Sequence, residues 1–264
     1  MLSGISTACL YPEYTETALK TILSHPVQAV EIFTNCKQEL SAGILSEMRK
    51  RADDCGTKIL SVHPYTSGME PMYFFSGYQR RFQEGIDLYK QYYQACNILG
   101  ADIVVFHGDT RDSRLSYSEY FERFGKLVDD ASTYGVSLCH ENVSRCVGYS
   151  PDFFTALAAE LPNAQFVLDV KQAVRSGQDV FNFAKSMGNR IKHVHISDNT
   201  CRSDCLAPGQ GDFNIAKLLD IITSNGFDGG VIVELYRDNF DGIVEIFNGY
   251  QHILSHLSTY SQND

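Results

Sequence analysis

The chain has 264 residues, of which 44% are hydrophobic and 12% aromatic, so it is long and apolar enough to bury a large core. Its formal net charge of −10 disfavours a nucleic-acid backbone as the main partner, because phosphate binding needs a basic surface. The sequence holds neither a signal-peptide pattern at its first residues nor the roughly 20 consecutive apolar residues that span a bilayer. We therefore expect a cytoplasmic protein that has no membrane partner.

The eight cysteines are scattered through a chain that is too large to need disulfide bonds, and we expect them to be reduced thiols. Cys201 and Cys205 have the spacing of half a zinc site. No second pair accompanies them, which disfavours a structural zinc site.

Short apolar segments alternate with amphipathic segments along the chain. Strands are expected at residues 2–8, 28–33, 58–63, 102–107, 136–141, 165–169, 191–195 and 231–234. Helices are expected at residues 15–24, 39–53, 78–99, 118–134, 151–160, 180–187, 215–224 and 242–258. Glycines such as Gly56, Gly100 and Gly135 stand between a helix and the next strand, where they supply a left-handed helix cap.

This alternation is typical of a (β/α)8 TIM barrel, an α/β fold, formed as a single domain by residues 1–264. A doubly wound sheet is the competing architecture. It predicts a glycine-rich phosphate turn after the first strand, and residues 7–12 (TACLYP) contain no glycine.

Six successive strands of this arrangement end in side chains that can bind a metal: His63, His107, Glu141, Asp169, His195 and Glu234. Each alone is explained by a salt bridge or a cap. In a barrel, however, the carboxyl ends of the strands meet at one mouth, and three buried carboxylates need a cation. Glu141, Asp169, His195 and Glu234 are an oxygen-rich ligand set with one imidazole, which suits a single manganese, magnesium, cobalt or zinc ion.

Other polar residues lie close to these strand ends in the sequence. Lys171 follows Asp169 by two positions; if the strand continues, Lys171 faces the same cavity and offsets its negative charge, and otherwise it is a solvated lysine on the rim. Arg202 follows the seventh strand and either reaches a substrate hydroxyl or phosphate or is solvated. Glu31, within the second strand, is expected to make a buried hydrogen bond across the barrel.

Several motifs, in this order and spacing, resemble those of the xylose isomerase-like TIM-barrel superfamily, which contains sugar isomerases and epimerases, inositol-catabolism enzymes and endonuclease IV. The motifs are VEIF (30–33), SVH (61–63), VFHGD (105–109), EN (141–142), LD (168–169), HVHISD (193–198), PGQGD (208–212) and VE (233–234). The resemblance implies one divalent metal held by Glu141, Asp169, His195 and Glu234, with the two glutamates moving protons.

Two departures from the superfamily pattern bear on the activity. Endonuclease IV has additional metal ligands in an Asp-x-His insertion after the seventh strand, whereas residues 199–207 (NTCRSDCLA) contain no histidine, which disfavours the three-zinc site of that enzyme. Many relatives carry Asp-x-x-His on the sixth strand, whereas residues 169–172 read DVKQ. Gln172 can bind a hydroxyl or carbonyl but cannot act as an acid near neutral pH.

We therefore expect a metal-dependent isomerase or epimerase that acts on a sugar, sugar phosphate or polyol by proton abstraction next to a carbonyl. Glu141 and Glu234 are the expected catalytic residues. Substrate-binding roles are expected for His63, His107, Lys171, Gln172 and Arg202, with His63 and His107 alternatively near a second metal or hydrogen-bonded on the rim. The alternatives are a metal-dependent dehydratase or lyase of inositol-type catabolism, an endonuclease IV-like DNA repair enzyme and a non-catalytic sugar-binding barrel. The sequence leaves open whether the chain forms a homo-oligomer.

Overall fold

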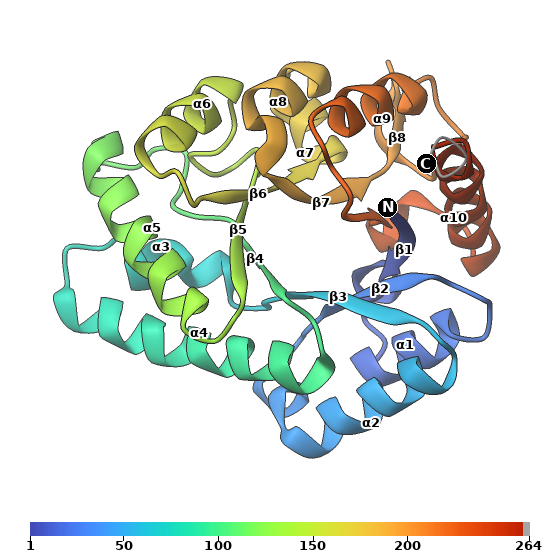
Figure 1. Ribbon diagram of the computed structural model, residues 1–264, viewed down its shortest axis with the longest axis horizontal. Coiled ribbons are helices and arrows are strands. Elements are labelled where there is room, and N and C mark those ends of the chain that lie inside the picture. The colour runs from blue at the N-terminus through green and yellow to red at the C-terminus, as the bar shows by residue number, and fades with distance from the viewer. Residues whose placement is uncertain (261–264) are drawn as a thin grey trace.

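Eight parallel strands close into a barrel in the computed structural model, which describes residues 1–260 (Figure 1). Around the barrel they run in the order β1, β10, β7, β6, β5, β4, β3, β2. Their bounds are β1 (Leu2–Ser6), β2 (Ala29–Phe33), β3 (Lys58–His63), β4 (Ile103–Phe106), β5 (Ser137–Glu141), β6 (Gln165–Asp169), β7 (Ile191–Ile196) and β10 (Gly230–Val233). The predicted TIM barrel is confirmed.

Helices form a layer outside the strands (Figure 1). The main helices are α1 (Thr15–Ile22), α2 (Ala42–Asp54), α4 (Gln79–Leu99), α5 (Tyr117–Ser132), α6 (Pro151–Glu160), α8 (Val180–Met187), α9 (Ile215–Ser224) and α10 (Ile243–Ser258). Additional short elements stand in the loops at the carboxyl ends of the strands: α3 (Glu70–Phe74), α7 (Val170–Arg175) and the hairpin of β8 (Asp198–Thr200) and β9 (Ser203–Leu206). Within residues 1–260, no helix combines the length and apolar character that crossing a membrane requires.

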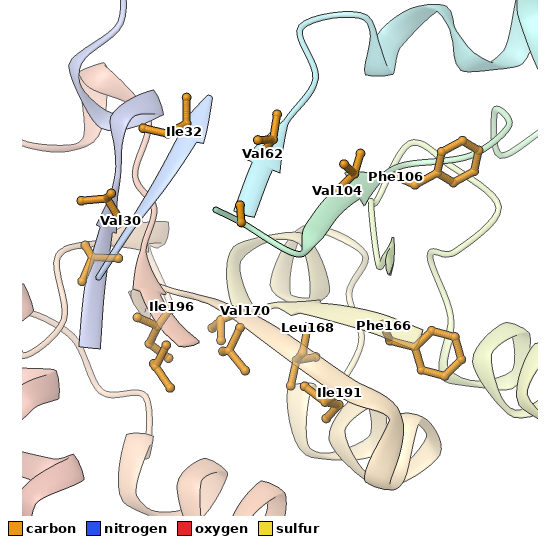
Figure 2. Close-up of a cluster of buried hydrophobic side chains, with 14 of the residues drawn as sticks. Val30, Ile32, Val62, Val104, Phe106, Phe166, Leu168, Val170, Ile191 and Ile196 are labelled. Carbon is orange, nitrogen blue, oxygen red and sulfur yellow. The ribbon is translucent and has the colours of Figure 1, made fainter. Parts of the chain in front are cut away.

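Side chains along each barrel strand alternate between the helical layer and the barrel interior, because successive residues of a strand point to opposite faces. Figure 2 shows Val62, Val104 and Leu168, which belong to the large buried cluster shared with the helices. The neighbouring positions point inward. Part of the interior is filled by a small apolar cluster of Ile103, Val105, Cys139 and Val167. The inward-pointing positions at the carboxyl ends of the strands are polar, and they lie beyond this apolar cluster.

The helix ends follow their local sequence. Gly100 caps α4 in the left-handed conformation, with φ of 72°, and Gly56 and Gly135 have φ of 68° and 71°. These values confirm the predicted role of the glycines in turning the chain into the next strand. At the start of α5, the side chains of Ser116 and Glu119 form a capping box that satisfies backbone N–H groups at the helix terminus.

Candidate active site

Four potential metal ligands meet at the mouth of the barrel. Glu141 and Asp169 are the last residues of β5 and β6, His195 is next to last in β7, and Glu234 directly follows β10. All four side chains are buried, and one ligand atom from each lies within 4.8 Å of the others. Barrel closure therefore brings together residues that are up to 93 positions apart (234 − 141) in the chain.

The separations within this cluster suit a divalent ion. The Nδ1 atom of His195 lies 2.8 Å from Oε1 of Glu141, 3.4 Å from Oε2 of Glu234 and 3.6 Å from Oδ2 of Asp169. A tetrahedral ion with bonds of about 2.1 Å places its ligand atoms roughly 3.4 Å apart. Small adjustments of these side chains would satisfy that geometry, so the donor set fits the metal that the sequence predicts.

Glu31 orients the imidazole of His195. Its Oε2 atom lies 3.0 Å from Nε2 of His195, and Glu31 also accepts hydrogen bonds from the hydroxyls of Ser61 (2.7 Å) and Ser6 (3.0 Å). The predicted buried hydrogen bond of Glu31 is confirmed. Although burial raises the pKa of Glu31, the charge of His195 and the bond from His193 lower it well below its usual value. A carboxylate behind a histidine is a common way to orient a metal ligand.

Asn142 positions the backbone of Asp169. The Nδ2 atom of Asn142 donates to the carbonyl oxygen of Asp169 (2.8 Å), and the Asp169 N–H donates to Oδ1 of Asn142 (2.7 Å). Oδ1 of Asp169 in turn caps α7 by accepting from the N–H of Gln172 at 2.9 Å. One oxygen of Asp169 is thus used to start a helix, while Oδ2 faces His195.

Lys171 enters the cluster by a different route from the one expected. The strand does not continue to Lys171, because α7 begins at Val170, but the side chain still points inward and is 2% exposed. Its Nζ atom donates to Oδ2 of Asp169 and to Oε2 of Glu234. The alternative of a solvated lysine is therefore wrong.

The electrostatic balance keeps Lys171 and His195 charged. Burial lowers the pKa of Lys171, but attraction to Asp169 and Glu234 outweighs burial and raises it well above its usual value. Burial likewise opposes a charge on His195, whereas Glu234 and Glu31 raise its pKa well above the usual value. The ammonium and the imidazolium are the positive charges that face the carboxylates of this cluster.

His63 and His107 form a second group around Glu141. Nε2 of His107 lies 2.9 Å from Oε2 of Glu141 and 3.1 Å from Nε2 of His63. Burial and the neighbouring His107 lower the pKa of His63 to about 3, so this ring is neutral near pH 7. Among residues 1–260, the Nδ1 atom of His63 is buried with no hydrogen-bond partner, which leaves a polar atom for a ligand or water.

A cavity of about 460 Å³ opens above both groups. It is lined by the predicted residues His63, His107, Glu141, Lys171, Gln172 and Glu234. The amide of Gln172 is engaged by neighbouring loops: Oε1 accepts from the hydroxyl of Ser144 (2.9 Å), and Nε2 donates to the hydroxyl of Tyr236 (3.2 Å). Gln172 therefore ties the loops after β5, β6 and β10 together on the cavity wall.

Sequence reasoning missed several cavity residues, including Arg145, Tyr236 and Arg237. The guanidinium of Arg145 lies 3.4 Å from Nδ1 of His107. Arg145 and Tyr236 follow the strand ends at Glu141 and Glu234 within a few positions, which is the signal that could have identified them.

Of the two alternatives for Arg202, the structure shows the solvated one. It lies on the exposed turn between β8 and β9 and lines a separate surface hollow, so the structure does not bring it to the cavity. The hairpin is anchored at its base by Asp198, which accepts hydrogen bonds from the N–H groups of Gly211 (3.0 Å) and Phe213 (2.9 Å). Cys201 is exposed and Cys205 buried, and neither belongs to a candidate metal cluster within residues 1–260.

The closed barrel, with a polar cluster at the carboxyl ends of its strands, defines a protein of the (β/α)8 class. A sequence model of the xylose isomerase-like TIM barrel family matches residues 19–259. The chain belongs to this family.

Comparison with individual proteins agrees with that assignment. Fructoselysine 3-epimerase of Escherichia coli O157:H7 is 23% identical over 207 residues, which are 75% of this chain and 75% of that protein. The crystal structure of a D-tagatose 3-epimerase-like protein is similar at a TM-score of 0.82 and 20% identity, over 100% of this chain and 99% of the other. The structure of an IolI protein with a bound zinc atom has a TM-score of 0.80 and 20% identity, over 98% and 99% of the two chains.

Proposed function

We propose that this protein is a divalent-metal-dependent isomerase or epimerase that acts on a sugar, sugar phosphate or polyol by moving a proton next to a carbonyl. The observation that carries the proposal is the convergence of Glu141, Asp169, His195 and Glu234 in one buried cluster, of which Glu141 and Glu234 line the cavity. Support also comes from the relatives, which include a fructoselysine 3-epimerase and a putative hydroxypyruvate isomerase.

Glu141, Asp169, His195 and Glu234 would hold the metal, with Glu31 behind His195. A divalent ion bound there supplies Lewis acidity, which stabilises the negative charge that develops on a substrate carbonyl oxygen. The ion is manganese, magnesium, cobalt or zinc, because three carboxylates and one imidazole suit each of these metals.

Glu141 and Glu234 are the residues that move the proton. Burial raises the pKa of Glu141, but hydrogen bonds from His107 and His195 outweigh it and lower the pKa well below its usual value, so Glu141 is ionised. One glutamate removes the proton from the carbon next to the carbonyl. The other returns a proton to the opposite face, which inverts that carbon. His63 and His107, on the cavity wall, bind substrate hydroxyls.

Solvent deuterium exchange tests the proposal. The metal-loaded protein is incubated in D₂O with ketoses, with and without a phosphate group, and deuterium at the carbon next to the carbonyl is followed by NMR. We expect Glu141→Gln and Glu234→Gln to abolish uptake without loss of fold, as judged by circular dichroism and Tm. The exposed Glu84 of α4 provides the matched control, Glu84→Gln. Normal rates in both active-site variants would remove this mechanism.

Metal content tests the ligand set separately. After loading and dialysis, elemental mass spectrometry is expected to find about one equivalent of a divalent ion in the wild type and none in Glu234→Ala. Two equivalents would show that a second ion binds, for which His63 and His107 with Glu141, or His193 with Glu31 and His195, are the candidate ligands. The products of the ketose incubations separate the alternative functions. Loss of water from the substrate, in place of epimerisation, would show that the protein is a dehydratase. Binding of a ketose without any deuterium exchange would show that it is a sugar-binding barrel.

A further inference from the structure

Lys171 binds the same oxygen atoms that the metal needs. Its Nζ atom donates to Oδ2 of Asp169 and Oε2 of Glu234, and these two oxygens are the ones that face Nδ1 of His195 at 3.6 Å and 3.4 Å. The ammonium group therefore lies against half of the four-ligand set. A divalent ion that binds these two oxygens is repelled by the ammonium group already bound to them, so the two cations compete for the same negative charge.

The position of Lys171 is built into the fold. Asp169 is the N-cap of α7, which places Lys171 in the first turn of that helix, directly behind the carboxylate. The side chain is 2% exposed, so its contacts with Asp169 and Glu234 are buried contacts and not those of a mobile surface lysine. Buried carboxylates require a positive partner, and Lys171 supplies one that is covalently attached to the site.

Tyr236 lies beside the ammonium group of Lys171. The ring of Tyr236 lies with its centroid 5.5 Å from Nζ of Lys171, and both side chains line the cavity. An aromatic face attracts an ammonium group at this range. Release of Asp169 and Glu234 requires a rotation of the flexible lysine stem into this cavity; the guanidinium of Arg175 already lies 4.5 Å from the centroid of the Tyr236 ring.

We propose that Lys171 is a tethered cation that competes with the divalent metal: it holds Asp169 and Glu234 in the metal-free protein and is displaced when the metal binds. This inference rests on the metal site of the proposed function. Because the metal must displace an ion pair, it binds more weakly and exchanges more readily than the four ligands alone would allow. The relevant property of Lys171 is its charge at this position.

Metal affinity is the direct test. Mn²⁺ and Zn²⁺ are titrated separately into the metal-stripped wild type, Lys171→Met and Lys171→Arg, with dissociation constants from calorimetry or competition with a chelator. Methionine keeps most of the unbranched side chain and lacks the charge, and we expect Lys171→Met to bind at least tenfold more tightly than the wild type. Lys171→Arg keeps the charge and is expected to bind no more tightly than the wild type. The matched control is Lys20→Met at an exposed position of α1, which should not change the affinity.

Thermal unfolding in EDTA gives a second readout. The Tm of Lys171→Met should fall relative to the wild type, because two buried carboxylates lose their positive partner, and saturating Mn²⁺ should restore it. The competitor role would be overturned if Lys171→Met bound the metal no more tightly than the wild type, or if Lys171→Arg bound it as tightly as Lys171→Met. If Lys171→Met binds more tightly while no ketose takes up deuterium in any variant, the competitor role holds and the isomerase proposal fails. If ketoses take up deuterium but Lys171→Met binds metal no more tightly, the isomerase proposal holds and the competitor role fails.

Discussion

The Nε2 atom of His195 lies 3.0 Å from Oε2 of Glu31, while Nδ1 of the same ring lies 2.8 Å from Oε1 of Glu141. The imidazole therefore links a carboxylate inside the barrel to the carboxylates at its mouth. Glu31 accepts a hydrogen bond from Nε2, so Nδ1 is the nitrogen that can bind a metal once the imidazolium has lost its Nδ1 proton. The orientation of this ligand depends on a residue of β2 that lies 164 positions earlier in the chain.

Replacing Glu31 tests this arrangement. The Glu31→Gln variant keeps the size of the side chain but loses the negative charge behind His195, and we expect metal affinity to fall by about 10- to 100-fold. Equilibrium dialysis with elemental mass spectrometry measures the change. Ser6→Ala is the control, since Ser6 bonds Glu31 through its other oxygen, Oε1, at 3.0 Å. An affinity of Glu31→Gln within twofold of the wild type would contradict the orienting role.

Asn142 is predicted to stabilise both the fold and the ligand position. Asn142→Ala leaves the buried N–H and carbonyl of Asp169 without their partners, and each such loss costs about 1–3 kcal/mol. We expect the free energy of unfolding in urea to fall by roughly 2–6 kcal/mol, and metal affinity to fall with it. Asn182→Ala, at an exposed position of α8, should leave both quantities unchanged; a similar loss there would show that the effect is not specific.

The buried carboxyl group of Glu70 is expected to make the free energy of unfolding depend on pH. Burial raises the pKa of Glu70 to about 7 from its ordinary value of 4.5, against the attraction to His107 and the hydrogen bond from Tyr89. Because the folded protein binds this proton more tightly than the unfolded chain, the contribution is complete below pH 4.5 and is lost as pH rises through about 7. A shift of this size corresponds to about 3 kcal/mol at most.

The measurement is the free energy of unfolding of the wild type and of Glu70→Gln at several pH values between 4.5 and 7. Glutamine stays neutral, so the wild type should lose stability relative to the variant as the pH rises. Parallel curves for the two proteins would show that Glu70 does not titrate in this range. Tyr89→Phe, which removes one hydrogen bond to Glu70, should strengthen the effect by making the carboxylate less favourable.

Arg145 and Arg202 are predicted to differ in substrate binding. Arg145 lines the cavity beside His107, whereas Arg202 lies on the exposed turn of the β8–β9 hairpin. We expect Arg145→Ala to raise KM about tenfold, which corresponds to roughly 1.4 kcal/mol of binding energy, and Arg202→Ala to leave KM within about twofold. Deuterium-exchange rates at varied ketose concentration give both values. An increase in KM for Arg202→Ala alone would reverse this assignment and imply that the hairpin moves toward the cavity.

Local signals accounted for much of the fold. The expected bounds of α6, α8 and α9, and those of β6, agree with the structure. Each of the three helices ends within two residues of a breaker, namely Pro162, Gly188 or Gly226. The strand ends at Glu141, Asp169 and His195 could also be predicted, since one polar residue follows or ends each apolar run. The short helices α3 and α7 were missed, because five or six residues are too few to show a helical period.

The candidate site was predictable only in part. Barrel closure follows from the alternation of elements, so the meeting of Glu141, Asp169, His195 and Glu234 could be expected from the sequence. The directions in which the loop side chains point could not be expected from the sequence. Arg202 was expected near the substrate because it follows β7, but the intervening residues pair as a hairpin that carries it to an exposed turn.

The sequence by itself determined the repeated strand–helix unit, the closure of eight such units and the identity of the polar residues at the strand ends, because these depend on the spacing of neighbouring residues. Only the tertiary structure decided which partners those residues have. Glu31 lies behind His195, and Lys171 lies against Asp169 and Glu234, because contacts across a barrel depend on register, helix starts and side-chain rotation. Register, helix starts and side-chain rotation cannot be predicted from the spacing of neighbouring residues alone.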